Sequence, residues 1–320
     1  MIKVENLKKA FGPKFAVNGV SFSVERGEVL GFLGPNGAGK STTMRMITGF
    51  IPPTNGRVTV GGFDIIANPI EAKRLIGYLP ENAPAYSDMT VHSFLSFSAE
   101  IRGLSGRERS TAIERVIDLC FLDSVVQQSV DTLSKGYRHR TCFAQSIIHD
   151  PDILILDEPT DGLDPNQKHE VRSIIKRMGE KKAIIFSTHI LEEVEAVCSR
   201  AIIVDRGQIV ADGTPDQLKL KSPNAGAVFL KLRGAEASAA KERLAKIGPV
   251  DKVLVLEDGD TITLKLTAKE SGNSGDLAAS VADAVNQARW RIEELRTEEG
   301  KLDEVFRSIT KPDTAKKEAA

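Results

Sequence analysis

The sequence has 320 residues, enough for two domains, and its 41% hydrophobic and 27% charged side chains are an ordinary globular balance. Its 43 Lys and Arg residues nearly match 44 Asp and Glu residues, so the formal charge is -1 and no net field attracts a polyanion such as nucleic acid. The three cysteines, Cys120, Cys142 and Cys198, fit neither a disulfide framework nor a zinc site, so we expect buried thiols in a reducing compartment.

No apolar run approaches the roughly 18 to 20 residues that span a bilayer. The N-terminal stretch "MIKVENLKKAFG" also lacks the apolar core of a signal peptide. We therefore expect a cytoplasmic protein that needs a partner if it acts on a membrane.

Short β-rich runs alternate with helical runs over residues 1–220. The runs "VLGFLG" (29–34), "DILILDE" (152–158) and "AIIFSTH" (183–189) are almost continuously apolar, which is typical of strands buried on both faces of a parallel sheet. The segment of about 87–150 instead repeats its apolar residues at helical spacing. These patterns predict an α/β domain with a helical insert.

A loop rich in Ser, Pro, Asn and Gly at 221–227 is predicted to link this domain to a second one over 228–310. The second domain shows strand, helix, hairpin, helix, strand and a final helix, and Asp258-Gly259 favours a type I′ turn in the hairpin. The order βαββαβ predicts a small α+β domain of the ferredoxin-like type. It has no catalytic constellation, so dimer support or partner docking is favoured over ligand sensing. Residues 311–320 are expected to form a flexible tail.

A phosphate loop is predicted between the first apolar strand and the helical run after it. The stretch "GPNGAGKST" matches G-x-x-x-x-G-K-[ST] in that context, which argues against an ordinary glycine-rich turn. Lys40 would reach the β and γ phosphates of a nucleotide, and the Ser41 hydroxyl would coordinate Mg²⁺. Backbone N–H groups and the helix N-terminus would bind phosphate as well. The expected binding residues are Gly34, Pro35, Asn36, Gly37, Ala38, Gly39, Lys40, Ser41 and Thr42.

Acidic residues end the second apolar run, and a histidine ends the third. Because ligands bind at the carboxyl ends of parallel strands, we expect Asp157 to hold Mg²⁺ and Glu158 to polarise the attacking water. The alternative is a carboxylate pair that only caps a strand. His189 is expected at the same edge, where it could donate a hydrogen bond to the γ-phosphate, although a lone histidine is usually structural. The Asn-Lys-x-Asp motif of GTPases does not occur in the sequence.

The stretch "DTLSKGYRHR" (131–140) looks basic and, taken alone, fits a solvated helix face or a nucleic-acid contact. Ser134 is a good N-cap for a helix expected to reach Asp150, where Pro151 stops it, and the N–H groups beside Ser134 would form a second anion site. With Gly136, the stretch resembles the Leu-Ser-Gly-Gly-Gln signature of ATP-binding-cassette (ABC) proteins.

The resemblance to ABC proteins covers residues 1 to about 215 and implies a P-loop NTPase fold that binds ATP and Mg²⁺. It implies that Ser134 and Gly136 close on the γ-phosphate held by a second copy of the chain. Phe11 matches the aromatic residue that stacks on adenine. Asp164 ends a "DGLD" loop that would cross the dimer interface, and His189 takes the position of the family's switch histidine.

The sequence also departs from the ABC pattern. Glu81 stands where the family usually has a glutamine that touches Mg²⁺ at the hinge of the helical insert, so it keeps a metal-binding oxygen and adds negative charge. Lys135 and Tyr137 replace a glycine and the glutamine of the signature. These departures and the C-terminal domain are similar to the ABC-2 type exporter subfamily, which includes gliding-motility systems.

The resemblance therefore implies a homodimeric ATPase subunit on the inner face of the plasma membrane. Such a subunit powers export through a separate transmembrane permease by ATP-driven closure of the dimer. Two alternatives stay open. One is a soluble ABC mechanoenzyme, which usually has two cassettes or a coiled-coil insertion, and the other is an ATP-sensing regulatory module without turnover.

Overall fold

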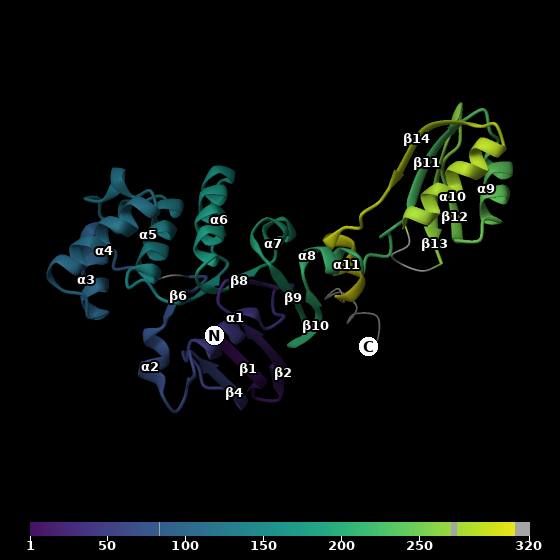
Figure 1. Cartoon of the computed structure of the whole chain (residues 1–320). Coiled ribbons are helices and arrows are strands. Elements are labelled where there is room, and N and C mark those ends of the chain that lie inside the picture. Colours follow the sequence, from purple (N-terminus) through teal and green to yellow (C-terminus); the bar gives the residue numbers. More distant parts are fainter. Residues whose placement is uncertain (83, 270–273, 311–320) are drawn as a thin grey trace. The chain divides into compact units, whose positions relative to one another are not determined.

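Three β-sheets organise the part of the chain that the computed structural model describes, residues 1–82, 84–269 and 274–310 (Figure 1). Contacts divide the chain into two units, Met1–Thr214 and Pro215–Ala320. The division lies upstream of the linker expected at 221–227, because the short helix α8 (Pro215–Lys219) contacts α11 (Leu302–Ile309) in the second unit. The expected tail at 311–320 lies outside the described residues.

A six-stranded sheet with the order β10-β9-β3-β8-β7-β6 forms the centre of the first unit. Every residue of β3 (Val29–Leu33), β7 (Ile153–Asp157) and β8 (Ala183–Thr188) is buried, which confirms the prediction from their continuous apolar character. Only the edge strand β10 runs antiparallel to its neighbour within this described sheet. The other strands are β6 (Ile76–Leu79), β9 (Arg200–Asp205) and β10 (Gln208–Gly213).

The register of the parallel strands brings their carboxyl ends to one edge. Leu33 pairs with Thr188, Asp157 with Ser187, and Leu79 with Leu156. The loops after β3, β6, β7 and β8 therefore begin side by side. The phosphate loop, Glu81, Glu158 and His189 follow these strands, so the sheet collects them at this edge.

A second sheet of the first unit has the order β2-β1-β4-β5 and is antiparallel, and it was not predicted from the sequence. Helix α1 (Lys40–Ile47) buries Met44 and Ile47 in a cluster that holds residues of both sheets. The helix that follows the phosphate loop is therefore anchored between the two sheets. The strands are β1 (Ile2–Phe11), β2 (Lys14–Val24), β4 (Asn55–Val60) and β5 (Phe63–Asp64).

The predicted helical insert contains α3 (Val91–Ile101), α4 (Gly106–Leu119) and α5 (Lys135–Ile147). Ser134 caps α5, because its hydroxyl accepts a hydrogen bond from the Tyr137 N–H at 3.3 Å. Helix α5 ends before the expected end at Asp150, which has a left-handed φ of 51°.

Three further helices complete the first unit: α2 (Pro69–Arg74), α6 (Pro165–Gly179) and α7 (Leu191–Val197). Among the described residues, no helix combines the length and apolar composition needed to cross a bilayer. All three cysteines are buried thiols, as expected. Burial raises the pKa of the Cys142 thiol to about 11, so this thiol stays protonated and weakly reactive near neutral pH.

The second unit contains the predicted βαββαβ arrangement, followed by α11. Its sheet order β12-β13-β11-β14, with every neighbouring pair antiparallel, is that of a ferredoxin-like domain. Figure 1 shows α9 and α10 beside this sheet, and their apolar residues share one core with it. The elements are β11 (Val228–Arg233), α9 (Ala237–Ala245), β12 (Val250–Glu257), β13 (Thr261–Ala268), α10 (Ser274–Gln287) and β14 (Arg291–Thr297).

The predicted type I′ turn at Asp258-Gly259 is wrong. Strand β12 ends at Glu257 and strand β13 begins at Thr261, so the loop between them is longer than a two-residue turn. A type I′ turn needs positive φ at both central residues, and neither Asp258 nor Gly259 has it. The register shifts between Val255 and Glu257, and this irregularity separates the strands before the turn.

Gly77 in β6 lets this strand pack closely against the end of α5. A Cβ atom added at Gly77 would lie 2.3 Å from the Ser146 carbonyl oxygen and 2.8 Å from Pro151 Cγ. Because β6 leads to Glu81 and α5 begins after Ser134, this close contact links two parts of the candidate site.

We predict that Gly77→Ala lowers the free energy of unfolding by about 1–3 kcal/mol, because the added methyl group overpacks the contact with α5. Urea titration of both proteins measures the difference. The matched control is Gly248→Ala, where the new methyl group meets nothing within 4 Å, and it should change the value by less than about 0.5 kcal/mol. Equal effects of the two substitutions would contradict the close packing of β6 on α5.

Candidate functional site

The phosphate loop connects β3 to α1 and closes one side of a pocket of about 390 Å³. Gly39, the residue before α1, has a φ of 106°, and a Cβ there would lie 2.4 Å from the Ala16 carbonyl oxygen. Only glycine fits this position without strain. The pocket is lined by Ala16, Pro35, Asn36, Gly37, Gly39, Lys40, Ser41, Thr42, Glu81 and Glu158. Gly34 and Ala38 belong to the same loop but do not line the pocket.

Lys40 places a buried ammonium group at the pocket wall, with only 5% of the residue exposed. Its Nζ donates a hydrogen bond to the Gly34 carbonyl oxygen at 2.8 Å and lies 3.6 Å from Glu158 Oε1. A buried cation is costly unless anions or dipoles surround it, so this arrangement suits an anionic ligand.

Asp157 is fully buried at the end of β7. Its Oδ1 accepts hydrogen bonds from Ser41 Oγ at 3.2 Å and Ser187 Oγ at 2.5 Å. Its Oδ2 is buried without a hydrogen-bond partner among the described residues. An unpartnered buried carboxylate oxygen is costly, and a cation is the partner that fits it. The Ser41 and Asp157 oxygens suit Mg²⁺, which binds one or two carboxylates together with substrate phosphates.

Glu158 points its carboxylate between two basic groups. Its backbone has a left-handed φ of 52°, and its N–H donates to Ser187 Oγ at 3.0 Å. Glu158 Oε2 lies 2.9 Å from His189 Nδ1, and the side chain is only 12% exposed. Burial raises the pKa of the Glu158 carboxyl, and the charges of Lys40 and His189 oppose this rise. The backbone conformation thus holds Glu158 against His189 at the pocket edge.

The remaining predicted residues lie in two other places. Phe11 ends β1 and is 56% exposed, with Lys9 Nζ 5.4 Å from its ring centroid, and it does not line the pocket. Ser134 and Gly136 begin α5 and also lie outside the pocket. Asp164 caps α6 by accepting a hydrogen bond from the Gln167 N–H at 3.0 Å.

Gln167 places the beginning of α6 against the beginning of α5. A Cβ added at Gly136 would lie 2.3 Å from the Gln167 side-chain oxygen. Lys135 also pairs with Asp161 at 3.2 Å. Within one copy, the signature stretch and the "DGLD" loop are therefore neighbours, while the phosphate loop forms a pocket without them.

Four polar residues near the site were not among the residues predicted from the sequence. Ser187 joins Asp157 to the Glu158 backbone, and Thr160, Thr188 and Glu193 form a buried group below the same loops. The two polar letters in "AIIFSTH" were a usable signal, because polar side chains that end a buried strand need partners. Glu193 gave no such signal, because it is one of two adjacent glutamates in the sequence and nothing there distinguishes it from Glu192, which is exposed.

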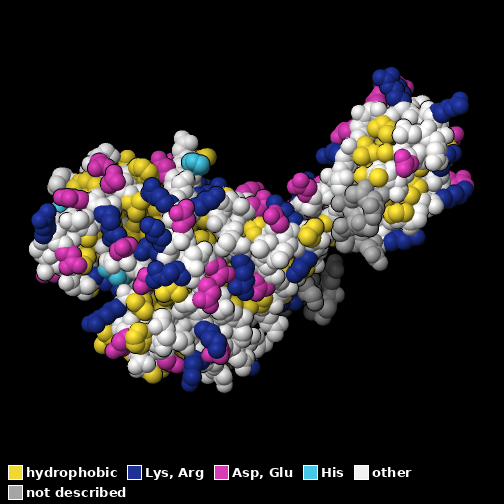
Figure 2. Space-filling model, in the orientation of Figure 1, with side chains coloured by type: hydrophobic (Ala, Val, Ile, Leu, Met, Phe, Trp, Pro, Cys, Tyr) yellow, Lys and Arg dark blue, Asp and Glu magenta, His cyan; other side chains and the backbone are white. Residues whose placement is uncertain are grey.

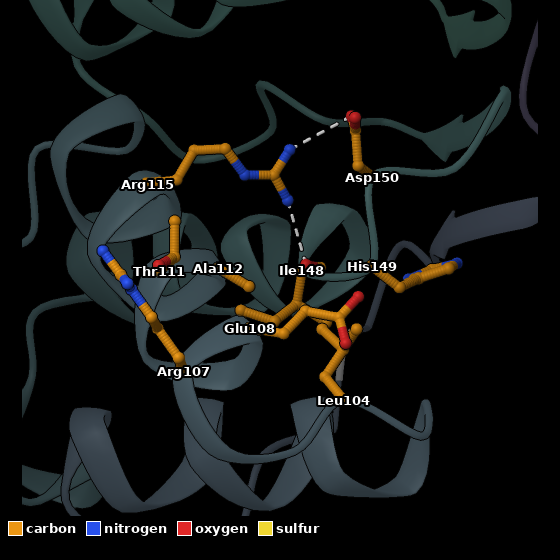
Figure 3. A pocket seen from close by; sticks show the side chains of 9 residues that line it. All are labelled: Leu104, Arg107, Glu108, Thr111, Ala112, Arg115, Ile148, His149 and Asp150. Carbon is orange, nitrogen blue, oxygen red and sulfur yellow. Dashed lines mark hydrogen bonds and ion pairs between the residues drawn. The ribbon is translucent and has the colours of Figure 1, made fainter.

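A larger pocket of about 550 Å³ lies in the helical insert (Figure 3). Its Arg115 already pairs with Asp150 at 3.1 Å and donates to the Ile148 carbonyl oxygen at 2.9 Å. None of the predicted site residues lines it. The smaller pocket is lined by the phosphate loop, Glu81 and Glu158, and Asp157 is hydrogen-bonded to Ser41 of its wall, so this pocket is the candidate site.

Comparisons with known proteins agree with this assignment. The sequence model of the ABC transporter family matches residues 17–161. The chain is 33% identical over 311 residues to the linearmycin resistance ATP-binding protein LnrL of Bacillus subtilis (strain 168). The matched region covers 97% of this chain and 98% of LnrL. The chain is 40% identical over 225 residues to the probable multidrug ABC transporter ATP-binding protein YbhF of Escherichia coli (strain K12), covering 70% of this chain and 39% of that protein.

A solved structure described as the ATP-binding subunit of an ABC transporter superimposes with a TM-score of 0.64 and 29% identity, covering 68% of this chain and 92% of that chain. With a relative that matches over nearly its full length, the chain belongs to the ABC transporter family, as an ATP-binding and ATP-hydrolysing member.

Proposed function

We propose that this protein hydrolyses ATP at the phosphate-loop pocket to drive a separate permease, with Glu158 as the general base. The observation that carries the proposal is the convergence of Lys40, Asp157, Glu158 and His189 at one edge of the central sheet. Strand-end positions of this kind are held by the sheet itself, so little reorganisation is needed when the reaction occurs.

Each residue of the edge has a role that matches its geometry. Lys40 and the loop N–H groups bind the β and γ phosphates. Ser41 and Asp157 would hold Mg²⁺, with Glu81 among the residues that line the pocket, and the bound ion would neutralise phosphate charge. Glu158 accepts a proton from the attacking water, and burial favours proton acceptance by raising its pKa.

His189 contacts Glu158 through Nδ1, so Nε2 is the nitrogen left for the γ-phosphate. Nε2 can donate a hydrogen bond to that phosphate when the ring carries a proton on both nitrogens. This arrangement assigns His189 two tasks: it orients the Glu158 carboxylate and contacts the phosphate. Phe11, exposed at the end of β1, is available to stack on adenine.

A second copy of the chain supplies the rest of the site. Ser134 and Gly136 are at the N-terminus of α5, where unpaired N–H groups favour an anion, yet they do not line the pocket of their own copy. We infer that they close on the γ-phosphate of the partner copy, and that Asp164 lies near this interface. ATP binding then closes the homodimer and hydrolysis reopens it.

The permease contacts the helical insert through an apolar strip, which we define as Tyr86, Phe97 and Ile101. Tyr86 and Phe97 pack edge to face with centroids 5.5 Å apart, and Ile101 is 68% exposed. Figure 2 shows hydrophobic side chains among charged ones over the helical elements of the first unit. Exposed apolar groups of this kind favour a protein partner. LnrL is named for linearmycin resistance and YbhF as part of a probable multidrug transporter, and both names favour export as the direction. We propose the inner face of the plasma membrane as the location.

We predict that Glu158→Gln still binds ATP with Mg²⁺ but hydrolyses it at least about tenfold more slowly, because the amide cannot accept the proton. The variant should also accumulate as an ATP-bound dimer, which light scattering with size-exclusion chromatography detects. Glu192→Gln, which removes an exposed carboxylate, is the control and should retain normal turnover. Normal hydrolysis by Glu158→Gln would remove Glu158 from the role of base.

Capture of the tagged protein from detergent-solubilised membranes of its native host tests the permease proposal. We expect mass spectrometry to find a polytopic membrane protein in near-stoichiometric amount. Ile101→Glu should lower its recovery at least about fivefold by placing a charge in the apolar strip. Phe50→Glu, at an exposed phenylalanine outside the strip, should not lower it. Recovery of ribosomes or nucleic-acid enzymes instead would favour the mechanoenzyme alternative.

A further inference from the structure

Glu193 is a fully buried carboxylate in the first turn of α7. Its Oε1 accepts hydrogen bonds from Thr160 Oγ1 at 2.5 Å and from Arg172 Nη2 at 3.1 Å. Its Oε2 accepts a hydrogen bond from Thr188 Oγ1 at 2.7 Å. Both carboxylate oxygens are therefore used, and both are directed at defined partners.

The two threonines belong to the segments that carry Glu158 and His189. Thr160 lies in the loop directly after Glu158, and Thr188 is the residue before His189. Both threonines are buried, so each hydroxyl has a fixed environment. One carboxylate thus ties together the two segments whose side chains meet at 2.9 Å.

Thr188 also fixes the turn that follows His189. Its hydroxyl accepts a hydrogen bond from the Ile190 N–H at 3.0 Å while it donates to Glu193. Without Glu193 as acceptor, the Thr188 hydroxyl would be free to rotate. Its lone pair would then no longer be held toward the Ile190 N–H, and the turn would be less constrained. The position of the His189 ring depends on that turn.

Stability alone is a weak reason for such a carboxylate. Arg172 and the Lys168 Nζ, 3.9 Å from Glu193 Oε1, balance its charge from α6. Buried ion pairs often add little to stability compared with apolar residues of similar volume. The hydrogen bonds to the two loop threonines go beyond what charge balance requires, and they constrain geometry near the reacting groups.

We propose that Glu193 is a positioning residue for ATP hydrolysis, which holds the loop after Glu158 and the turn at His189 in one fixed arrangement. The proposal rests on the proposed roles of Glu158 and His189. Misplacement of a catalytic group by about 1 Å can lower the rate roughly 100-fold, so a change in this arrangement should strongly affect kcat. ATP binding depends on Lys40 and the phosphate loop, which Glu193 does not contact.

The test compares Glu193→Gln with Glu192→Gln, which removes the same charge from an adjacent, exposed position of α7. We expect Glu193→Gln to lower kcat at least about tenfold, while the Kd for ATP with Mg²⁺ changes less than about threefold. Glu192→Gln should change neither quantity. Thermal unfolding of each variant gives the folded fraction to which kcat is normalised.

Threonine variants carry the test if Glu193→Gln folds poorly. Thr160→Val and Thr188→Val remove one hydroxyl each at nearly constant shape, and each should lower kcat at least about fivefold with ATP affinity retained. Thr160→Ser and Thr188→Ser keep the hydroxyl and should retain most of the wild-type kcat. Equal losses with valine and serine would overturn the proposal, because they would show a packing effect and not a hydrogen bond.

A double variant separates this proposal from the proposed function. If Glu193 acts through Glu158, Glu193→Gln should lower the residual activity of Glu158→Gln by less than about twofold. A full additional loss overturns the positioning role, and so does wild-type kcat in Glu193→Gln alone. Wild-type activity in Glu158→Gln overturns the base assignment instead, so the two failures are distinguishable.

Discussion

Asp157 and Ser187 pair across β7 and β8, and this parallel register sets the position of the chemical groups at the nucleotide edge. The same register places Thr188 beside Leu33, so His189 and the phosphate loop leave the sheet together. Main-chain hydrogen bonds fix these positions. The central strands are apolar and buried on both faces of the sheet, and this packing holds the sheet rigid. A slip by one residue would turn Asp157 away from Ser41 and separate the groups.

Lys40, Asp157 and Glu158 bring buried or nearly buried charge to this edge, and all but one of the carboxylate oxygens of Asp157 have a defined partner. Asp157 accepts hydrogen bonds from two hydroxyl groups but keeps one oxygen without a partner among the described residues. Lys40 lies between a loop carbonyl and Glu158, and Glu158 lies between Lys40 and His189. Such partly satisfied polar groups reduce stability, and sites with ligand-dependent function are where they are expected.

Local patterns in the sequence predicted the parts of the site that depend on short segments. The phosphate loop requires glycines at fixed spacing between a strand and a helix, and the strand ends locate Asp157, Glu158 and His189 because parallel strands share one edge. The Ser134 cap is likewise a local feature. Continuous apolar runs predicted β3, β7 and β8, and the pattern of the second unit predicted its ferredoxin-like order.

Features that depend on tertiary contacts could not be predicted in this way. Register shifts within β1 break the alternation that marks a half-buried strand, so the antiparallel sheet gave no clear signal. Glu193 resembles the exposed Glu192 in sequence, and only the fold brings it to Thr160 and Thr188. The loop after Glu257 also differs from its two-residue turn signal, because an irregular register widens the hairpin.

The structure of Glu158→Gln with ATP and Mg²⁺ would show whether one copy or two copies of the chain enclose the γ-phosphate. We predict a dimer in which the γ-phosphate contacts Lys40 and His189 of one copy and Ser134 and Gly136 of the other. ATP bound at the phosphate loop of a monomer, with the signature stretch of no second copy near the phosphate, would contradict it.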